Sequence, residues 1–189
     1  MPSYVNVYPN TLDEEFCASV VETFQNDHRI QDDPQPDYSR RKYLNLSAHT
    51  DWLGIVSKFL LKTNELAEDY FSVPDGMEDV AVTDWIDDGF IMSHYRPGDD
   101  LILHFDGQNS EENYNGLRLA TVLFFLSTCE GGELYFPFQD LKIAPVQGTA
   151  VVFPPGHTHP HQVLGVETDR FAVQTWLTHP EFKVVSTTD

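Results

Sequence analysis

From Val80 onward, the chain consists of short runs of β-branched and aromatic residues separated by turn-forming dipeptides such as Gly131-Gly132. Seven of these runs fit strands: 80–86, 90–95, 101–105, 117–126, 133–137, 149–153 and 170–177. Short runs at this spacing are typical of antiparallel sheets that close on themselves or pack face to face. The pattern therefore predicts a β-sandwich or β-barrel for this region.

Two helices are predicted before the β-rich region. Residues 11–26 carry an apolar side chain every four positions, and Thr11 with Glu14 fits a capping box. A second apolar stripe at helical period predicts a helix over 51–71. Because each helix has one apolar face, we expect both to buttress one face of a sheet, in an α+β fold that is mainly β.

The length and composition fit one globular domain. A chain of 189 residues is below the size at which single cores tend to split, and 41% hydrophobic with 13% aromatic residues excludes a mainly disordered chain. We expect one domain over 1–189, in which 1–79 form a helical support region and 80–178 form the β core. We find no internal repeat in the sequence.

The charge balance restricts the partners. Thirty acidic residues against eleven basic ones give a formal net charge of −19, which repels nucleic-acid backbones and anionic lipids. The chain has no leader-like start and no run of about 18 apolar residues, so we expect a cytoplasmic protein. Cys17 and Cys129 are far apart in sequence, which predicts two reduced thiols and no paired-cysteine metal site.

Two stretches are predicted as loops, 31–42 and 107–116. The first holds the consecutive basic residues Arg40, Arg41 and Lys42 in an otherwise acidic chain. It fits either a solvated loop or a mobile lid that recognises an acidic substrate. The second loop directly follows the candidate metal ligands described next, so we expect it at the mouth of the site.

Histidine and aspartate residues lie at spacings that suit a metal ion. In a strand, His104 and Asp106 point to the same face because they are two positions apart. Near another strand, His157, His159 and His161 alternate, and any of them could supply a third ligand. Two histidines and one carboxylate leave coordination positions open, as in non-haem Fe(II) oxygenases, whereas a structural zinc site needs a fourth protein ligand.

Arg170 opens the last apolar run of the chain. A guanidinium at the head of a buried strand needs a partner, and its planar fork suits a bidentate grip on a carboxylate. A bound ligand could supply that carboxylate, and so could Asp169 or another acid at the end of a strand.

Several segments together resemble a known family. In order along the chain they are Tyr95-Arg96-Pro97-Gly98, His104-x-Asp106, the strand from Arg118 to Leu126, Gly131 to Pro137, Gly148 to Phe153, and Pro160-His161 followed by Arg170 and Trp176. This series resembles the iron- and 2-oxoglutarate-dependent dioxygenases, in particular their prolyl hydroxylase branch. The resemblance runs from about Phe90 to Trp176. The first third of the chain resembles the family only in its helical character.

The resemblance implies a double-stranded β-helix, or jelly roll, and a set of site residues. His104, Asp106 and His161 would bind iron, and His161 is preferred over the other two histidines because Arg170 follows it by nine positions and because it is part of a Pro-His step. Arg170 would bind the far carboxylate of 2-oxoglutarate, and Tyr95 would donate its hydroxyl to the same cosubstrate. Fe(II), 2-oxoglutarate and O₂ are thus implied, with ascorbate as the reductant.

The chain also departs from the family pattern. Arg170 stands where collagen-type enzymes have lysine, so the chain resembles the arginine-bearing hypoxia-sensing and bacterial group. Phe125 occupies the place of a second cosubstrate-binding tyrosine in some relatives, which leaves Thr121 or Tyr135 to compensate. Ala172 stands where many relatives have serine.

The resemblance further implies hydroxylation of an unactivated C–H bond with release of succinate and CO₂. A prolyl residue of a peptide or protein is the expected substrate, and a free amino acid is the nearest rival. Arg118 and Trp176 are candidates for substrate contact and pocket wall. Two hypotheses from different classes stay open: a cupin-like metalloprotein that does not use 2-oxoglutarate, and a metal-free binding domain.

The remaining histidines are not expected to bind the metal. His94 adjoins Tyr95 but points to the opposite strand face. His28, His49 and His179 fall near predicted helix ends or loops, which predicts surface positions.

Overall fold

The computed structural model describes residues 4–77, 79, 81–107 and 118–180. Its helices are α1 (Glu14–Gln25) and α2 (Leu53–Tyr70), the latter preceded by two 3-10 turns over Leu46–Ala48 and Thr50–Trp52. Its strands are β1 (Asn6–Tyr8), β2 (Gln31–Asp32), β3 (Lys42–Asn45), β4 (Ile86–Asp87), β5 (Ile91–Tyr95), β6 (Leu101–His104), β7 (Arg118–Phe125), β8 (Leu134–Phe136), β9 (Leu141–Ile143), β10 (Ala150–Phe153), β11 (His161–Val163) and β12 (Arg170–Thr178).

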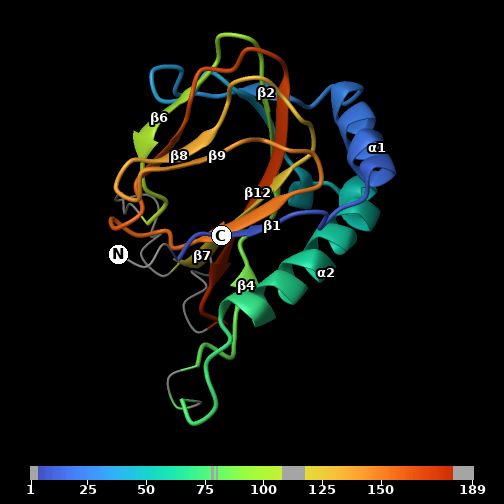
Figure 1. Ribbon diagram of the computed structural model, residues 1–189. Coiled ribbons are helices and arrows are strands. Elements are labelled where there is room, and N and C mark those ends of the chain that lie inside the picture. Colours follow the sequence, from blue (N-terminus) through green and yellow to red (C-terminus); the bar gives the residue numbers. More distant parts are fainter. Residues whose placement is uncertain (1–3, 78, 80, 108–117, 181–189) are drawn as a thin grey trace, which may run out of the picture.

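The strands form two antiparallel sheets. The larger sheet has the order β1-β10-β7-β12-β5-β3-β2, with β4 paired to β12, and the smaller sheet has the order β6-β11-β8-β9. In Figure 1, α1 and α2 lie together on one side of the molecule. The prediction of a mainly β protein with antiparallel sheets and two helices is confirmed.

The central strands of the large sheet are apolar on both faces. In β7, Val122 and Phe124 join a core cluster that includes residues of both helices, while Leu123 and Phe125 join a second cluster with β8 and β10. This explains why β7 has an almost continuous apolar run, since alternate residues enter different cores. The same alternation in β12 directs Arg170, Ala172, Gln174 and Trp176 toward the space between the sheets.

The first 79 residues contribute more than helical support. Strands β1, β2 and β3 all belong to the large sheet, where β1 pairs with β10 and β3 pairs with β5. The predicted loop over 31–42 accordingly contains β2 and reaches the first residue of β3. These strands lack the apolar run that marks a strand in sequence, because most of their residues are exposed or half-buried.

The predicted helices are present, but the capping box is wrong. Helix α1 begins at Glu14, and the side chain of Asp13 caps it by accepting a hydrogen bond from the Phe16 amide at 2.7 Å. Thr11 instead donates its hydroxyl to the Tyr8 carbonyl at 2.8 Å. The carboxylate at position 13 therefore takes the N-cap place that the sequence pattern assigned to Thr11. Helix α2 ends within one residue of the predicted end.

The strand predicted over 80–86 is mostly wrong. Of its described residues only Ile86 lies in a strand, the short β4. Trp85 instead packs against Phe71, with ring centroids 5.6 Å apart, and donates its indole N–H to Asn64 in α2 at 3.1 Å. Trp85 thus serves packing against the end of α2 rather than a strand ladder.

Both cysteines are free thiols, as predicted. Cys17 is buried in α1, and Cys129 is half-buried. Almost all of the loop predicted over 107–116 lies outside the described residues. Among the described residues, neither helix combines the length and the apolar character that crossing a membrane requires.

Candidate active site

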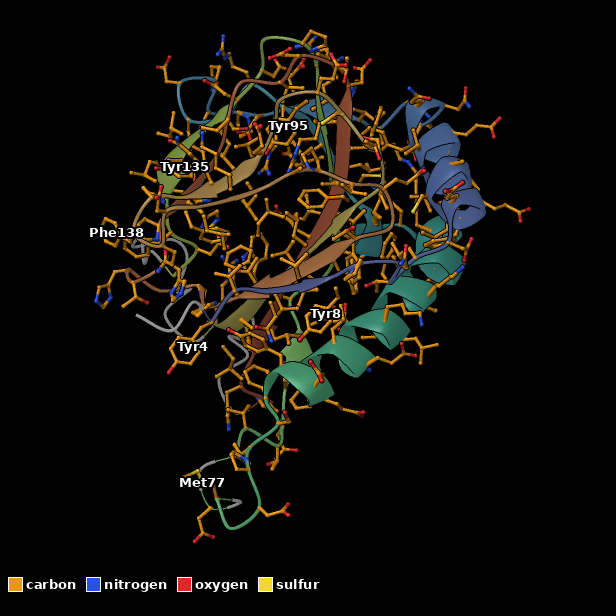
Figure 2. The ribbon with its side chains drawn as sticks, viewed as in Figure 1. Tyr4, Tyr8, Met77, Tyr95, Tyr135 and Phe138 are labelled. Carbon is orange, nitrogen blue, oxygen red and sulfur yellow. The ribbon has the colours of Figure 1, made fainter. Side chains whose placement is uncertain are left out.

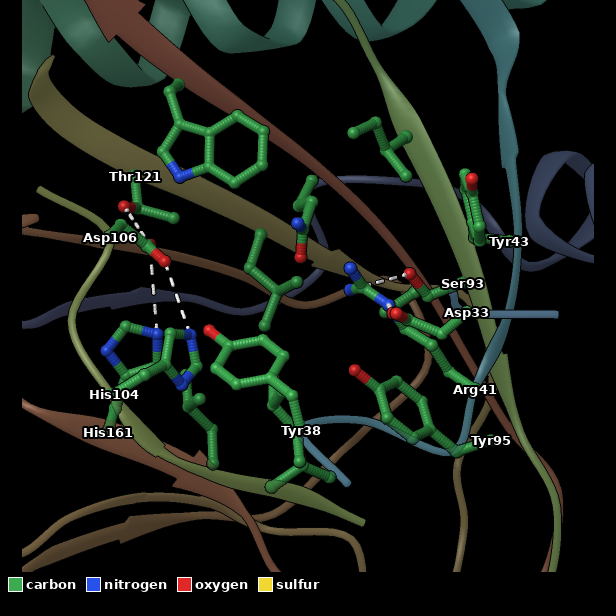
Figure 3. Close-up of a pocket in the computed structure, with 18 of the residues that line it drawn as sticks. Asp33, Tyr38, Arg41, Tyr43, Ser93, Tyr95, His104, Asp106, Thr121 and His161 are labelled. Atoms are coloured by element: carbon green, nitrogen blue, oxygen red, sulfur yellow. Dashed lines mark hydrogen bonds and ion pairs between the residues drawn. The ribbon is translucent and has the colours of Figure 1, made fainter. Parts of the chain in front are cut away.

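The structure brings His104, Asp106 and His161 together between the sheets. His104 ends β6 and His161 begins β11, and the two residues are direct partners in the antiparallel register of the small sheet. The ligand atoms of these two histidines and of Asp106 all lie within 4.8 Å of one another. Figure 3 shows both imidazoles facing the carboxylate, with Nε2 of His104 at 3.3 Å and Nε2 of His161 at 3.7 Å from its oxygens.

The orientation of both imidazoles is fixed by the backbone. Nδ1 of His104 lies 2.9 Å from the Ile102 carbonyl, and Nδ1 of His161 lies 3.1 Å from the His159 carbonyl. A carbonyl can only accept, so each Nδ1 carries a proton, which leaves each Nε2 as the nitrogen that can bind a metal ion. This is the form of histidine that binds a metal ion.

In the metal-free cluster the pKa values of Asp106 and His161 are both lowered. Burial raises the pKa of Asp106, but His161 and His104 beside it outweigh this effect and hold that pKa below its usual range. Burial also lowers the pKa of His161. A carboxylate and a neutral imidazole are the ligand forms that a divalent cation requires.

Of the three alternating histidines, His161 alone joins the cluster. His159 is buried against Phe136, with ring centroids 6.5 Å apart, and its Nδ1 lies 2.9 Å from the Thr158 hydroxyl. His157 is exposed. The sequence left three histidines as candidates for the third ligand. In the structure, the turn before β11 places only His161 of these three beside Asp106.

Three side chains of the large sheet surround Asp106. Thr121 donates its hydroxyl to an Asp106 carboxylate oxygen at 2.6 Å. Arg118 donates to the Asp106 carbonyl at 2.9 Å, and its guanidinium lies 3.6 Å from the centre of the Trp176 ring. Thr121 is therefore engaged at the carboxylate, while Arg118 and Trp176 form a stacked pair on the pocket wall.

Arg170 lies at the other end of the same pocket and is only 1% exposed. Its Nε donates to the Gly132 carbonyl at 3.0 Å, its guanidinium lies over the Tyr95 and Phe125 rings, and its Nη2 has no hydrogen-bond partner among the described residues. Asp169, the acid that could have paired with it, points elsewhere and contacts His94. Burial lowers the pKa of this guanidinium.

A glycine makes room for Arg170. Gly132 has a φ of +68°, and a Cβ at this position would lie 2.9 Å from Cδ of Arg170. The Gly131-Gly132 turn thus both adopts the left-handed conformation and lets the arginine side chain lie against the backbone. Together with the Nη2 that has no partner among the described residues, this arrangement of Gly132 and Arg170 fits a carboxylate-bearing ligand at the arginine.

The pocket between the metal cluster and Arg170 has a volume of about 460 Å³. Its wall includes Tyr95, which is 2% exposed, but not Tyr135, which lies on β8 between the buried Leu134 and Phe136 and therefore faces the outside of the small sheet (Figure 2). Of the two residues expected to compensate for Phe125, Thr121 is hydrogen-bonded to Asp106 and Tyr135 is outside the pocket.

Sequence reasoning missed part of the wall. The 31–43 segment contributes Asp33, Tyr38, Arg41 and three further residues to the lining. Tyr38 packs edge-on against His104 with ring centroids 5.3 Å apart, and burial raises its pKa. The one sequence signal was the basic run over 40–42, which did not indicate which of its members faces inward.

The remaining histidines lie away from the cluster, as predicted. His94 lies on the face opposite Tyr95, where it stacks on Phe171 at 4.2 Å and contacts Asp169 at 2.6 Å. His28, His49 and His179 are half-buried or exposed and do not line the pocket.

The cluster of two histidines and one carboxylate between the two sheets could hold one metal ion and would leave coordination positions open. Residues 90–178, which contain all the candidate ligands and Arg170, match the family model described as the 2OG-Fe(II) oxygenase superfamily. The match identifies residues 90–178 as a 2OG-Fe(II) oxygenase domain and supports a 2-oxoglutarate-dependent dioxygenase, a family whose cofactors are Fe(II), 2-oxoglutarate and O₂. No curated protein matches the chain in sequence.

Solved structures of prolyl hydroxylases have a similar fold. The viral collagen prolyl hydroxylase of Paramecium Bursaria Chlorella virus-1, in its 2OG complex, is 20% identical with a TM-score of 0.69, over 94% of this chain and 97% of that one. The prolyl hydroxylase of Trichoplax adhaerens, in complex with a hypoxia inducible factor peptide, is 16% identical with a TM-score of 0.75, over 98% and 88%. A Pseudomonas putida prolyl-4-hydroxylase is 16% identical with a TM-score of 0.66, over 94% of both chains.

Proposed function

We propose that the protein hydroxylates a prolyl residue of a peptide or protein, using Fe(II), 2-oxoglutarate and O₂. The observation that carries this proposal is the joint lining of one pocket by the His104, Asp106 and His161 cluster and by the unpaired guanidinium of Arg170. In this proposal the two sheets form a double-stranded β-helix that the helices buttress, and the chain acts as a single domain.

Each ligand of the cluster has a defined part. Nε2 of His104, a carboxylate oxygen of Asp106 and Nε2 of His161 would hold the iron, and the backbone carbonyls at Nδ1 keep both imidazoles in the binding tautomer. When bound, Fe(II) and 2-oxoglutarate supply O₂ activation, in which the cosubstrate loses CO₂ to become succinate and a substrate C–H becomes C–OH. Thr121 would orient Asp106 rather than contact the cosubstrate.

The cosubstrate would lie along the pocket, with its 2-oxo acid end toward the cluster. Arg170 would bind the far carboxylate through Nη2, which has no other acceptor among the described residues. Tyr95 is its neighbour in the β5–β12 register, and would donate its hydroxyl to the same ligand. The aromatic rings of Tyr95 and Phe125 exclude water from this end, which strengthens the ion pair.

Arg118 and Trp176 would contact the substrate at the metal end. Trp176 has an indole N–H, and Arg118 an Nε, without a hydrogen-bond partner among the described residues. Flat aromatic surface beside free donors suits a pyrrolidine ring that is flanked by peptide carbonyls. The prolyl hydroxylases of similar fold support this choice of substrate by analogy of fold.

The test is succinate formation from 2-oxoglutarate with Fe(II), ascorbate and O₂, in the presence of proline-containing peptides. We expect turnover to be lost in His161→Ala and Arg170→Ala, and kept in His157→Ala, whose exposed histidine lies outside the cluster. Hydroxylation is checked by a mass gain of one oxygen atom in the peptide, with alanine-substituted peptides and free L-proline as matched controls.

Each result has a definite meaning. Oxidation of free proline but of no peptide would replace the peptide substrate with a small amino acid. Stoichiometric binding of Fe(II) without any succinate would contradict the proposed use of 2-oxoglutarate and would favour cupin-like chemistry. Equal loss of activity in His157→Ala and His161→Ala would contradict the assignment of the third ligand.

A further inference from the structure

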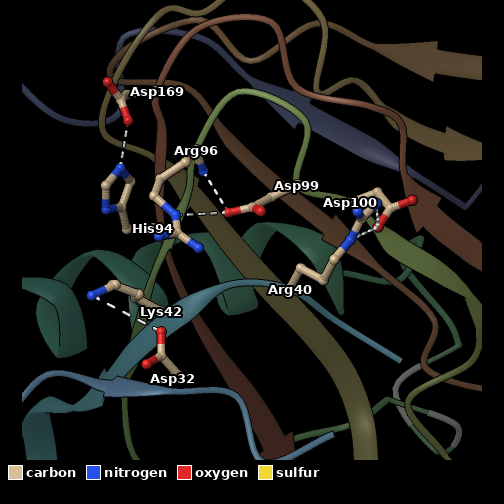
Figure 4. A network of polar contacts seen from close by, with 8 residues as sticks. All are labelled: Asp32, Arg40, Lys42, His94, Arg96, Asp99, Asp100 and Asp169. Atoms are coloured by element: carbon tan, nitrogen blue, oxygen red, sulfur yellow. Dashed lines mark hydrogen bonds and ion pairs between the residues drawn. The ribbon is translucent and has the colours of Figure 1, made fainter. Parts of the chain in front are cut away.

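The three consecutive basic residues of the 31–43 segment have different environments. Arg40 pairs with Asp100 at 2.9 Å, and Lys42 lies 3.9 Å from Asp32, both at the surface (Figure 4). Arg41 instead lines the pocket. Because Lys42 begins strand β3 and alternate residues of an extended chain face opposite ways, the sheet directs one guanidinium inward and the two flanking cations outward.

Arg41 is held against the part of the pocket that contains Tyr95. Its Nε lies 3.1 Å from Asp33, its Nη1 donates to the Ser93 hydroxyl at 3.2 Å, and it interacts with the Tyr95 side chain (Figure 3). Tyr95 pairs with Arg170 on β12, and Lys42 pairs with His94 in the neighbouring β3–β5 register. Arg41 and Arg170 therefore flank the same tyrosine on one face of the sheet.

This end of the pocket has more positive than negative charge. Arg41 and Arg170 interact with each other electrostatically, and within the described part of the chain the carboxylate that lines the pocket beside them is Asp33, which is paired with Arg41. Arg170 has no acidic partner among the described residues, so the net charge here is about one positive unit. A buried guanidinium and a half-buried one beside a single carboxylate favour the binding of a further anion.

The other candidate donors for such an anion are missing. Phe125 and Ala172, which lie in the row next to Arg170, have no side-chain polar atom, and Tyr135 is outside the pocket. Thr121 is engaged with Asp106. Arg41, which contacts Ser93 and Tyr95, is thus a cationic side chain that can replace the lost hydrogen-bond donors at this end.

We propose that Arg41 binds the far carboxylate of 2-oxoglutarate together with Arg170, so that the anion is held between two guanidinium groups from strand β12 and the 31–43 segment. This inference rests on the proposed function, because it assumes that the cosubstrate occupies this pocket. Arg41 exchanges part of its contact with Asp33 for the ligand, and the 31–43 segment becomes part of the cosubstrate site.

The test is the affinity of the Mn(II)-loaded protein for two 2-oxo acids, measured by isothermal titration calorimetry. The probes are 2-oxoglutarate and 2-oxobutyrate, which has the same metal-chelating end but no far carboxylate. We expect Arg41→Met to weaken 2-oxoglutarate binding by about tenfold to a hundredfold, the range of one charge-assisted hydrogen-bonded pair, and to leave 2-oxobutyrate binding unchanged. Arg41→Lys should give an intermediate value for 2-oxoglutarate.

Matched variants separate binding from support of the fold. Asp33→Asn removes the competing carboxylate, so 2-oxoglutarate should bind as tightly as in the wild type or more tightly. Arg40→Met, which changes the adjacent surface pair, should bind both probes as the wild type does. Unfolding temperatures of all variants show which of them fold. If Arg41→Met does not fold, Arg41→Lys and Asp33→Asn still decide the test.

Three outcomes would overturn the inference. One is an equal loss of affinity for both probes in Arg41→Met, and a second is an unchanged affinity for 2-oxoglutarate in that variant. The third is a loss in Asp33→Asn that matches the loss in Arg41→Met, which would make the ion pair purely structural. Arg170→Met is the reference for the proposed function: if it does not weaken 2-oxoglutarate binding, the proposed cosubstrate site is wrong regardless of Arg41.

Discussion

Each side chain of the metal cluster has a second contact that fixes its direction. The two imidazoles are tied to backbone carbonyls, and the Asp106 carboxylate accepts a hydrogen bond of 2.6 Å from Thr121. Asp106 follows the end of β6, so the strand alone does not fix its side chain. The hydroxyl of Thr121, from the opposite sheet, therefore supplies an orientation that the small sheet cannot.

Replacing this hydroxyl tests its role at the scale of one residue. We expect Thr121→Val, which keeps the shape of the side chain, to weaken Mn(II) binding by roughly tenfold to a hundredfold, the usual effect of losing a contact to a metal ligand. Thr121→Ser retains the hydroxyl and should bind Mn(II) nearly as the wild type does. Calorimetric titration measures both, and equal affinities in Thr121→Val and the wild type would show that Asp106 needs no such contact.

The sequence predicted those site residues that have a local signature. His104, Asp106 and Arg170 lie in or beside strands with clear patterns, and the Pro160-His161 step matched a family motif. Arg41 could not be singled out, because whether it faces inward depends on the pairing of β3 with β5, two strands about fifty residues apart in the chain. Tyr135 was a wrong candidate for the same reason, since its position relative to the pocket depends on the packing of two sheets.

At the scale of elements, one glycine joins the segment before α1 to the large sheet. The Gly148 carbonyl accepts a hydrogen bond from the Leu12 amide at 3.0 Å, and the Gly148 amide donates to the Phe125 carbonyl at 2.9 Å. Gly148 has a φ of +80°, and a Cβ there would collide with the Leu12 carbonyl oxygen. The close approach of the two backbones thus requires glycine.

Gly148→Ala should therefore lower the free energy of unfolding by about 1 to 3 kcal/mol, from the left-handed backbone and the collision together. The matched control is Gly54→Ala in α2, where nothing lies within 4 Å of the added Cβ and φ is not positive. There we expect a gain of up to about 1 kcal/mol. Urea unfolding curves measure both, and an unchanged stability of Gly148→Ala would show that this junction is free to shift.

The elements that were predicted are those whose own residues form a core face. The stripes of α1 and α2 and the apolar runs of β7, β10 and β12 all belong to the two large core clusters. The strands β1, β2 and β3 have mostly exposed or half-buried residues, so their pairing is determined by neighbouring strands. The segment before β4 gave the opposite error, a strand predicted where its described residues form none. Its apolar Trp85 packs on Phe71 instead of belonging to a strand.

At the scale of the whole molecule, the residues proposed to bind the metal and the cosubstrate come from both sheets. His104 and His161 both belong to the small sheet, whereas Arg170 and Tyr95 belong to the large one. A metal ion would therefore link neighbouring parts of the small sheet. A cosubstrate that binds both the metal and Arg170 would cross the pocket and link one sheet to the other.

We expect Mn(II) and 2-oxoglutarate together to raise the unfolding temperature by roughly 5 to 10 °C at ligand concentrations about a hundred times their dissociation constants. Mn(II) alone should give a smaller rise, and 2-oxoglutarate without metal almost none, because its chelating end then has no partner. Differential scanning fluorimetry with and without a chelator measures these shifts. An equal rise with 2-oxoglutarate in the presence of the chelator would contradict a metal-dependent bridge between the sheets.

The rise in unfolding temperature caused by the ligands should also depend on pH in a defined direction. Burial lowers the pKa of His161 below the ordinary value of about 6.5, so a larger share of this imidazole is neutral and able to bind metal at pH 6.5 than of an exposed histidine. In the metal-free protein, the stability that its neutral form contributes is present above about pH 6.5 and is lost as the pH falls through the lower pKa of the folded state. The rise in unfolding temperature caused by Mn(II) and 2-oxoglutarate should thus decrease as the pH falls from 7.5 toward 5, with most of the decrease below pH 6.5, as protons compete with the metal for Nε2. A decrease that is already complete at pH 6.5 would mean that His161 gains its proton as easily as an exposed histidine, which its burial between the sheets opposes.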